Sequence, residues 1–232
     1  SSYHGWQVQP NASTVQEQME KVFSTLLKEE AKIIGAGRTD TGVHASYFVA
    51  HVDSMHTDLD QRENFVHQVN KFLPDDIVVH NITRVHDDMH ARFSAKYRTY
   101  HYKINRVKPL FNREYNFYYY GNLDVTKINE ACQLLFKYKD FTSFSKVHTD
   151  VKTNDCRIME ARWTASDEAY LFEIKADRFL RNMVRSIVGS LLDIGMGKTG
   201  IEEFREIIEA KDRSRAGMSA PAKGLFLVDI GY

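Results

Sequence analysis

The sequence predicts an α+β protein built from two similar subdomains, and two observations support this. Apolar residues recur at helical spacing in some segments and alternate with polar residues in others, and both kinds of segment follow each other along the whole chain. The order helix, strand, strand, helix, strand resembles the split βαβ unit of ferredoxin-like folds. We therefore expect mixed, largely antiparallel sheets, with one subdomain at residues 1–105, a second at 106–232 and a cleft between them, where sites are common.

Apolar residues at helical spacing predict a helix over residues 15–27, which begins at a capping box of Thr14 with Glu17 or of Ser13 with Gln16. A second helix is expected over 65–73, because the same spacing ends there at Pro74, which cannot continue a helix. Short apolar or alternating runs predict strands at 32–37, 47–52, 77–85 and 97–104.

The second half repeats the alternation. Asp124 is expected to cap a helix that carries the apolar residues from Ile128 to Leu135. The run FLRNMVRSIVGSLLDIG has a strong helical stripe from Phe179 to Leu192. A shorter helix is predicted at 201–210, with Thr199 and Glu202 as its capping box, and strands are predicted at 159–163, 170–174 and 225–230.

Composition excludes some classes of protein. The chain has 232 residues, 43% hydrophobic and 27% charged, as in ordinary soluble proteins, and no apolar run approaches the roughly 20 residues of a membrane span. Lys plus Arg and Asp plus Glu both total 31, so any nucleic-acid site must be a local patch. The patterns around Cys132 and Cys156 are those of a buried helix or a strand edge, which favours a reducing, cytoplasmic setting. The chain opens on SSYHGWQ without Met or a first strand, so we expect that its N-terminus is incomplete.

Residues 35–45, GAGRTDTGVHA, allow three interpretations: a phosphate loop, a metal site or a catalytic carboxylate. The P-loop pattern fails because Val43 and His44 stand where Lys and Ser or Thr are required. The dinucleotide fingerprint fails because its third glycine would fall at Asp40, and the GMGKTG run at 195–200 fails because its first glycine would fall at Leu192. Phosphate binding is therefore disfavoured.

A metal site has weak support, because His44, His51 and the HDDMH run at 86–90 form no set with clear ligand spacing. The remaining interpretation is a single catalytic carboxylate, Asp40, with Arg38 close enough in sequence to favour its charged form. Its alternative is a tight turn, for which Thr-Asp-Thr-Gly is suitable chemistry.

Residues 92–113 combine basic and aromatic side chains with no acidic residue, which suits phosphate binding and therefore RNA. Tyr100, on the predicted strand, can stack on a base turned out of a nucleic-acid helix, unless the tyrosines simply fill a core. The candidate RNA-binding residues are Arg92, Lys96, Arg98, Lys103 and Arg106.

Arg178, Arg181 and Arg185 lie at i, i+3 and i+7 and form a basic stripe on the predicted helix, or a solvated face. Arg185 is bracketed by apolar neighbours and is expected to be partly buried. A buried arginine needs a carboxylate partner, for which Asp40 is a natural candidate.

Several motifs together resemble the TruA-type tRNA pseudouridine synthase family, and most closely its bacterial branch that modifies uridines 38, 39 and 40 of the anticodon stem-loop. These motifs appear in the family's order over nearly the whole chain: YHGWQ, GRTDTGVHA, HARFSAKYRTYHY, FTSFS, FLRNMVRSIVG, AKDR and GLFLVDI. Thr41 departs from the alanine that is more usual there.

The resemblance implies the pseudouridine synthase fold and a role for each matched residue. Asp40 is implied to be the catalytic aspartate, and Arg38 to displace and replace the flipped base and contact RNA. Tyr100 would stack on the target uracil and Arg185 would pair with the aspartate, while Leu225 and Leu227 look like the pocket wall.

The implied reaction breaks the N-glycosidic bond of uridine, rotates the uracil and rejoins it through carbon. It involves no redox change and no group transfer to a second molecule, so no nucleotide cofactor or metal is expected. Asp40 could attack C1′ or take a proton from C2′, and the sequence leaves both open. The family further implies a cytoplasmic homodimer that holds tRNA across both subunits. The competing class is a non-catalytic RNA-binding module that uses the same basic, aromatic strand.

Overall fold

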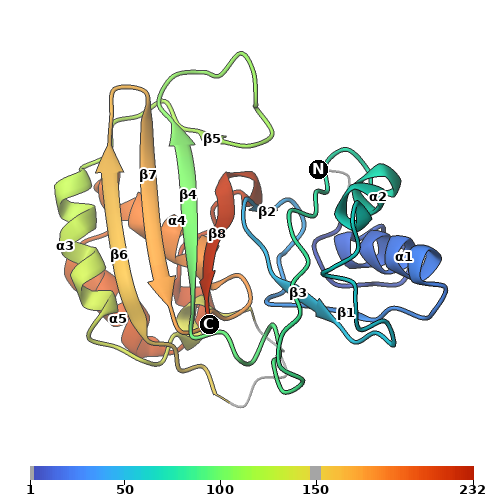
Figure 1. The fold of residues 1–232 in the computed structure, drawn as a ribbon. Coiled ribbons are helices and arrows are strands. Elements are labelled where there is room, and N and C mark those ends of the chain that lie inside the picture. Colours follow the sequence, from blue (N-terminus) through green and yellow to red (C-terminus); the bar gives the residue numbers. More distant parts are fainter. Residues whose placement is uncertain (1–2, 147–152) are drawn as a thin grey trace. The chain divides into compact units, whose positions relative to one another are not determined.

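The computed structural model describes residues 3–146 and 153–232, which divide into two compact units (Figure 1). The first unit comprises residues 1–42 and 49–95, and the second comprises 43–48 and 96–232. The border between the units therefore falls near residue 95, and the short segment 43–48 belongs to the second unit. The expected division into similar subdomains at residues 105 and 106 stays a prediction.

The first unit packs two helices against a two-stranded sheet. Helix α1 (Val15–Leu27) begins where Thr14 accepts a hydrogen bond from the Glu17 backbone, which confirms that capping position. Strand β1 (Ile33–Gly35) pairs antiparallel with β3 (Ala50–Val52). Helix α2 (Phe65–Phe72) ends before Pro74, as predicted. The ring of Phe65 packs edge-on against that of Phe23 in α1, with their centroids 6.2 Å apart.

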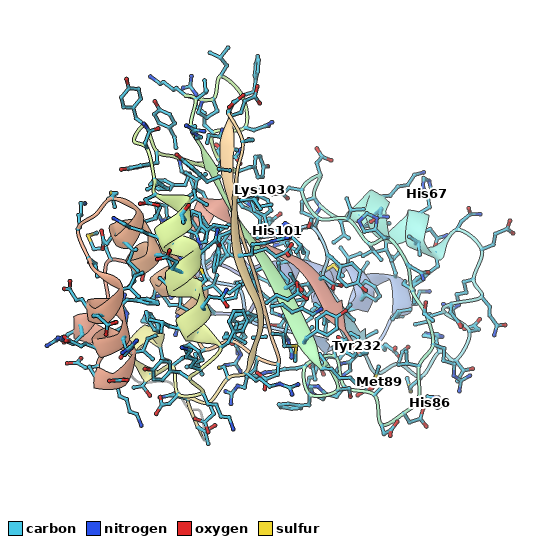
Figure 2. All side chains as sticks on the ribbon, turned by 90° about the vertical axis from the view of Figure 1, so that its left-hand side faces the viewer. His67, His86, Met89, His101, Lys103 and Tyr232 are labelled. Carbon is cyan, nitrogen blue, oxygen red and sulfur yellow. The ribbon has the colours of Figure 1, made fainter. Side chains whose placement is uncertain are left out.

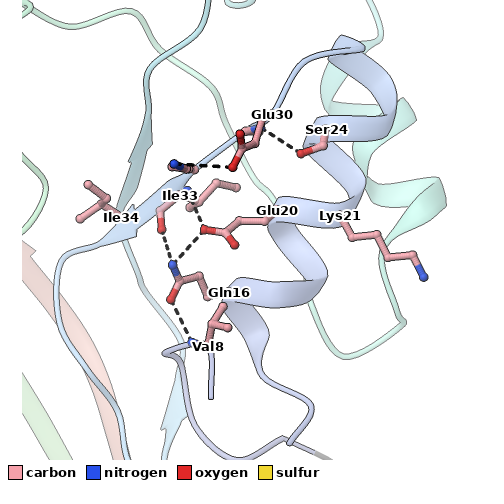
Figure 3. Close-up of a pocket in the computed structure, with 10 residues that line it drawn as sticks. Val8, Gln16, Glu20, Lys21, Ser24, Glu30, Ile33 and Ile34 are labelled. Atoms are coloured by element: carbon pink, nitrogen blue, oxygen red, sulfur yellow. Dashed lines mark hydrogen bonds and ion pairs between the residues drawn. The ribbon is translucent and has the colours of Figure 1, made fainter. Parts of the chain in front are cut away.

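The outer edge of β1 is closed by side chains of α1 (Figure 3). The backbone nitrogen of Ile33 donates to Glu20 at 3.0 Å, and its carbonyl accepts from the amide of Gln16 at 2.9 Å. Glu20 also accepts from that amide. An unpaired strand edge would leave these backbone groups without partners, so α1 fixes the strand that leads into GAGRTDTGVHA.

Two strand predictions in this region need correction. Residues 77–85, all of them described, lie outside any strand, because Asn70 occupies the place of a strand partner. Its side-chain amide both donates to and accepts from the backbone of Val79, at 2.8 Å each. The strand expected at 47–52 begins only at Ala50, because the nitrogens of Ser46 and Tyr47 donate instead to Leu227.

The second unit contains, in the part of the chain described, a six-stranded sheet, in which five strands follow the order β2-β8-β4-β7-β6 and the sixth, β5, pairs with β4. The pairs β4–β7, β4–β8 and β6–β7 are antiparallel, whereas β2–β8 and β4–β5 are parallel, so the sheet is mixed and largely antiparallel as predicted. Its strands are β2 (His44–Ala45), β4 (Tyr97–Asn105), β5 (Phe117–Tyr118), β6 (Ile158–Ala165), β7 (Ala169–Ala176) and β8 (Leu225–Gly231).

Helices cover one face of this sheet (Figure 1). They are α3 (Val125–Leu135), α4 (Met183–Gly195) and α5 (Ile201–Ala210), with short 3₁₀ helices at Thr142–Phe144 (η1), Arg213–Arg215 (η2) and Ala222–Gly224 (η3). Tyr102, Phe172 and Met183 are fully buried in the core between sheet and helices. Strand side chains alternate, so His101 and Lys103, labelled in Figure 2, lie on the opposite face.

Helix α4 begins later than the sequence predicts. Asn182 adopts a left-handed conformation with φ of 66°, so the chain turns there and the helix starts at Met183. Arg178 and Arg181 therefore precede the helix, and the predicted basic stripe is wrong. The capping box of Thr199 and Glu202 is also wrong, because the N-cap of α5 is Gly200, which has no side chain to accept a hydrogen bond.

The sequence does not predict the short strands β2 and β5, whereas the start of α3 agrees with it. Asp124 caps α3 by accepting from the Lys127 nitrogen at 3.0 Å, as predicted. Both cysteines are buried and free. Within the described residues, none of the helices is both long and apolar enough to cross a membrane.

We expect Cys132 and Cys156 to be unreactive in the folded protein. Burial raises the pKa of each thiol to about 12, so at pH 8 roughly one thiol in 10,000 is the reactive thiolate. A chromogenic disulfide reagent should label both thiols only after unfolding in urea. Rapid labelling of the native protein at pH 8 would contradict this burial.

Candidate active site

The predicted site residues are divided between the units. Arg38 and Asp40 lie in the loop after β1, in the first unit, whereas Tyr100, Arg185, Leu225 and Leu227 lie in the second. We describe the two sets separately.

The Asp40 loop is supported from beneath by the YHGWQ segment. The Trp6 nitrogen donates to the carbonyl of Thr39 at 3.3 Å, and Gly5 is packed against the same carbonyl. A Cβ atom at Gly5 would lie only 2.3 Å from the Thr39 oxygen, and Gly5 has a φ of 86°. Gly5 is therefore what allows this segment to pack under the residue before Asp40.

His44, at the end of the motif, has a structural role in the second unit. Its ring lies between those of Tyr115 and Phe226, with centroids 4.8 and 4.9 Å away, and its Nε2 is 3.1 Å from the Glu114 carbonyl. Burial lowers its pKa, which favours a neutral ring that donates to this carbonyl. No group of three or more His, Cys, Asp or Glu side chains suited to a metal occurs among residues 3–146 and 153–232.

Tyr100, Leu225 and Leu227 are brought together by strand pairing. Tyr100 lies opposite Leu227 across the β4–β8 pair, and its neighbour Tyr102 lies opposite Leu225. Both leucines are buried, and Phe179 meets the Tyr100 ring edge-on at 5.1 Å. The sequence does not reveal this role of Phe179, because its apolar spacing predicts a helical position and the helix begins only at Met183.

Arg185 lies half-buried in the first turn of α4, as expected from its apolar neighbours. Its Nε donates to the Ala220 carbonyl at 2.8 Å, and the Ala220 nitrogen donates back to the Arg185 carbonyl at 2.9 Å. Arg185 also lies close enough to Tyr102 for its charge to oppose the rise that burial causes in the pKa of that tyrosine. The side chain thus connects α4 to the segment before β8.

The candidate RNA-binding residues differ in exposure. Arg92, Lys96 and Lys103 are exposed, and the Lys103 ammonium lies 4.3 Å from the centre of the Phe226 ring. Arg98 is half-buried, which lowers its pKa, and donates to the Asp177 carbonyl at 3.1 Å. Arg106 donates to Ser166 at 2.6 Å and to Asn122, and lies 5.0 Å from the Tyr170 ring centre. Arg98 and Arg106 therefore anchor the fold, and RNA binding by these five residues stays a prediction.

Two other family landmarks contact each other. Ser143, from FTSFS, is fully buried and donates to the Ile207 carbonyl at 2.6 Å. Its oxygen also accepts from the nitrogen of Asp212, in AKDR, at 3.0 Å. This one hydroxyl fixes the end of α5 and the start of η2.

A surface hollow of about 530 Å³ lies between α1 and β1 (Figure 3). Two of its polar side chains, Gln16 and Glu20, close the edge of β1, and a third, Ser24, accepts from the Ala31 nitrogen at 2.9 Å. We therefore assign this hollow to the fold and not to catalysis.

A family model described as tRNA pseudouridine synthase matches residues 131–232. The tRNA pseudouridine synthase A of Bacteroides thetaiotaomicron is 52% identical over 235 residues, which cover 100% of this chain and 87% of that relative. The chain belongs to the tRNA pseudouridine synthase family. The Bacteroides fragilis relative of the same name is 53% identical, covering 99% of this chain and 91% of its own length. The Bacillus licheniformis relative is 39% identical, with 99% and 94% covered.

Membership of this family confirms the resemblance from the ordered motifs, and the α+β prediction agrees with the structure. The family match does not by itself assign roles to Asp40, Arg38, Tyr100 or Arg185.

We expect Gly5→Ala to destabilise the first unit by about 1–3 kcal/mol, because the methyl group meets a backbone carbonyl and the positive φ is strained. Gly37→Ala is the matched control in the Asp40 loop, since a Cβ there meets nothing within 4 Å. Urea unfolding measures both variants. Equal unfolding free energies for the two would show that Gly5 does not support the loop.

Proposed function

We propose that this member of the tRNA pseudouridine synthase family isomerises uridine to pseudouridine at positions 38, 39 and 40 of the tRNA anticodon stem-loop, with Asp40 as its catalytic residue. Family membership makes the protein an isomerase enzyme. The assignment of positions and residues is the part that we propose.

The observation that best supports this proposal is the short connection along the chain from Asp40 to β2, the strand that pairs with β8 next to β4. Only three residues separate Asp40 from His44, the first residue of β2. Strand β2 pairs with β8 at Leu227, and Leu227 lies opposite Tyr100. The chain therefore runs directly from the proposed catalytic carboxylate into the strands that carry the proposed uracil-binding residues.

The reaction needs only groups that this chain supplies. The bond between C1′ and N1 breaks, the uracil rotates and a bond forms between C1′ and C5. The C5 proton then leaves and N1 takes up a proton, so that the product is an isomer of uridine. Asp40 either attacks C1′ and is released when the new bond forms, or takes a proton from C2′ and later returns it. In either case one carboxylate suffices, and no electron acceptor or donor is consumed.

The other residues have binding roles in this proposal. Tyr100 stacks on the flipped uracil, with its ring held by Phe179, while Leu225 and Leu227 form the apolar wall. Arg185 supplies positive charge to Asp40. Arg38 is exposed and replaces the flipped base in the RNA helix.

Two further properties belong to the proposal. The buried free cysteines support a reducing compartment such as the cytoplasm. The homodimer rests on the family resemblance alone, and sedimentation of the purified protein with and without tRNA tests it.

We expect Asp40→Asn to abolish turnover while tRNA binding remains, because the amide is neither a nucleophile nor a base of comparable strength. The assay follows tritium released from C5 of uracil in labelled tRNA, and a gel-shift titration measures binding. Asp75→Asn, at an exposed aspartate of the same unit, is the control and should turn over normally. Tritium release by Asp40→Asn would remove Asp40 from the mechanism. Absence of release by the unaltered protein, with binding retained, would favour the RNA-binding module.

We expect Tyr100→Phe to keep the stacking ring and lose only steps that need the hydroxyl, whereas Tyr100→Ala should lower kcat/KM by about 10- to 100-fold. Tyr97→Ala, at a tyrosine of the same strand packed against Lys175, is the control. Assays run well below each variant's unfolding midpoint separate stacking from stability. Normal turnover by Tyr100→Ala would show that the ring does not hold uracil.

A further inference from the structure

The segment 216–220, between η2 and η3, lies against α4 from Arg185 to Ser190. The Gly217 nitrogen donates to Ser190 of α4 at 3.2 Å, and the Ala220 nitrogen donates to the Arg185 carbonyl at 2.9 Å. The Met218 carbonyl approaches Gly189 so closely that a Cβ atom there would lie 1.8 Å from its oxygen. Only glycine at position 189 therefore allows the backbone of the segment to pack this closely against the helix.

Arg213 holds this segment from within. Its Nη1 donates to the carbonyls of Ala216 and Gly217 at 3.2 and 3.3 Å, and its Nη2 donates to the Ser219 hydroxyl at 2.9 Å. The Ser219 oxygen also accepts from Asn182, the left-handed residue before α4, at 2.7 Å. One planar guanidinium thus fixes three residues of the segment and, through Ser219, connects them to the start of α4.

The Arg185 side chain is hydrogen-bonded to the same segment. Its Nε donates to Ala220, the residue after Ser219, at 2.8 Å. Because a guanidinium is planar, this bond limits the direction in which the two terminal nitrogens of Arg185 point. A shift of residues 216–220 would therefore redirect the Arg185 side chain without removing it.

We propose that Arg213 is a positioning residue for the isomerisation. It holds residues 216–220 in one conformation, and this segment in turn orients the Arg185 guanidinium toward the reacting uridine. The inference rests on the proposed function of Arg185. Arg213 acts through the segment and through Arg185, and does not itself touch the substrate.

Arg215 lies in the same 3₁₀ helix as Arg213, but its side chain points to the surface and is paired there with Glu206. Its side chain is 55% exposed, and its ion pair with Glu206 spans 4.0 Å at the surface. Arg215→Ala is therefore the matched control for Arg213→Ala, since both remove one arginine from the same 3₁₀ helix.

We expect Arg213→Ala to lower the single-turnover rate of pseudouridine formation by about 10- to 100-fold, because misplacement of a catalytic-site group by about 1 Å has effects of this size. The Kd for tRNA should change less than about twofold, and Arg215→Ala should retain the rate of the unaltered protein. Arg213→Lys should recover only part of the rate, because an ammonium cannot donate to all three acceptors in one plane. Should Arg213→Ala fail to fold, Ser219→Ala removes the shared acceptor and tests the same connection.

The deciding measurement is a double-mutant cycle with Arg185→Lys. If Arg213 acts through Arg185, Arg213→Ala should lower the single-turnover rate by a much smaller factor in the Arg185→Lys variant than in the unaltered protein. Rate losses that multiply would overturn the inference and leave Arg213 a stabilising residue only. If Arg185→Lys formed pseudouridine as fast as the unaltered protein, the inference would be overturned as well, because the orientation of the Arg185 guanidinium would then not matter for the rate. Failure of the proposed function is distinct, since the unaltered protein would then release no tritium in the same assay.

Discussion

The double pairing of β4 is the constraint on which the second unit depends. This strand is hydrogen-bonded to β7 on one side and to β8 on the other, so its register decides which side chains face the helices. The β8 register shifts at Tyr100, which lies opposite Leu227, whereas Thr99 lies opposite Asp229. This bulge leaves Val228 as the extra residue and keeps Leu227 and Ile230 buried on the same face. The pairing of Tyr100 with Leu227 is therefore a consequence of the bulge.

Side-chain amides complete this fold where strand partners end. Asn129 of α3 donates to the carbonyl of Trp163 and accepts from its nitrogen, at 3.0 and 2.9 Å, on the outer edge of β6. Asn70 makes the same two bonds to Val79, which lies outside any strand, and the Gln16 amide with the Glu20 carboxylate does so for the edge of β1. Backbone groups at a strand edge must find partners, and an amide provides both a donor and an acceptor. The edges are thus closed by helices and loops without another strand.

Sequence reasoning predicted those parts of the molecule that depend on local periodicity. Most helices lie close to their predicted positions. The motif that contains Asp40 can be recognised because its residues are contiguous, and the role of Asp40 stays a prediction. The strand predicted at 77–85 is wrong because the partner of Val79 is the Asn70 side chain, which periodicity does not reveal. The predicted start of α4 is too early because the left-handed conformation of Asn182 leaves the apolar stripe unchanged. Composition counts the charges of Arg98 and Arg106 but does not show that both side chains also donate within the fold, and their binding of RNA stays a prediction. The pairing of Tyr100 with Leu227 requires the register, which pattern alone does not provide.

The family landmarks that carry no reactive group have a common physical role. YHGWQ packs its glycine under the residue before Asp40, and FTSFS supplies the hydroxyl that binds the backbone of AKDR. AKDR in turn supplies Arg213, which binds the segment that receives Arg185. Catalytic groups must be held within about 0.5 Å of their working geometry, and a loop cannot do so by itself. The landmarks are therefore best explained as backbone supports for the residues that are proposed to meet the uridine, each contributing a close approach or a hydrogen bond.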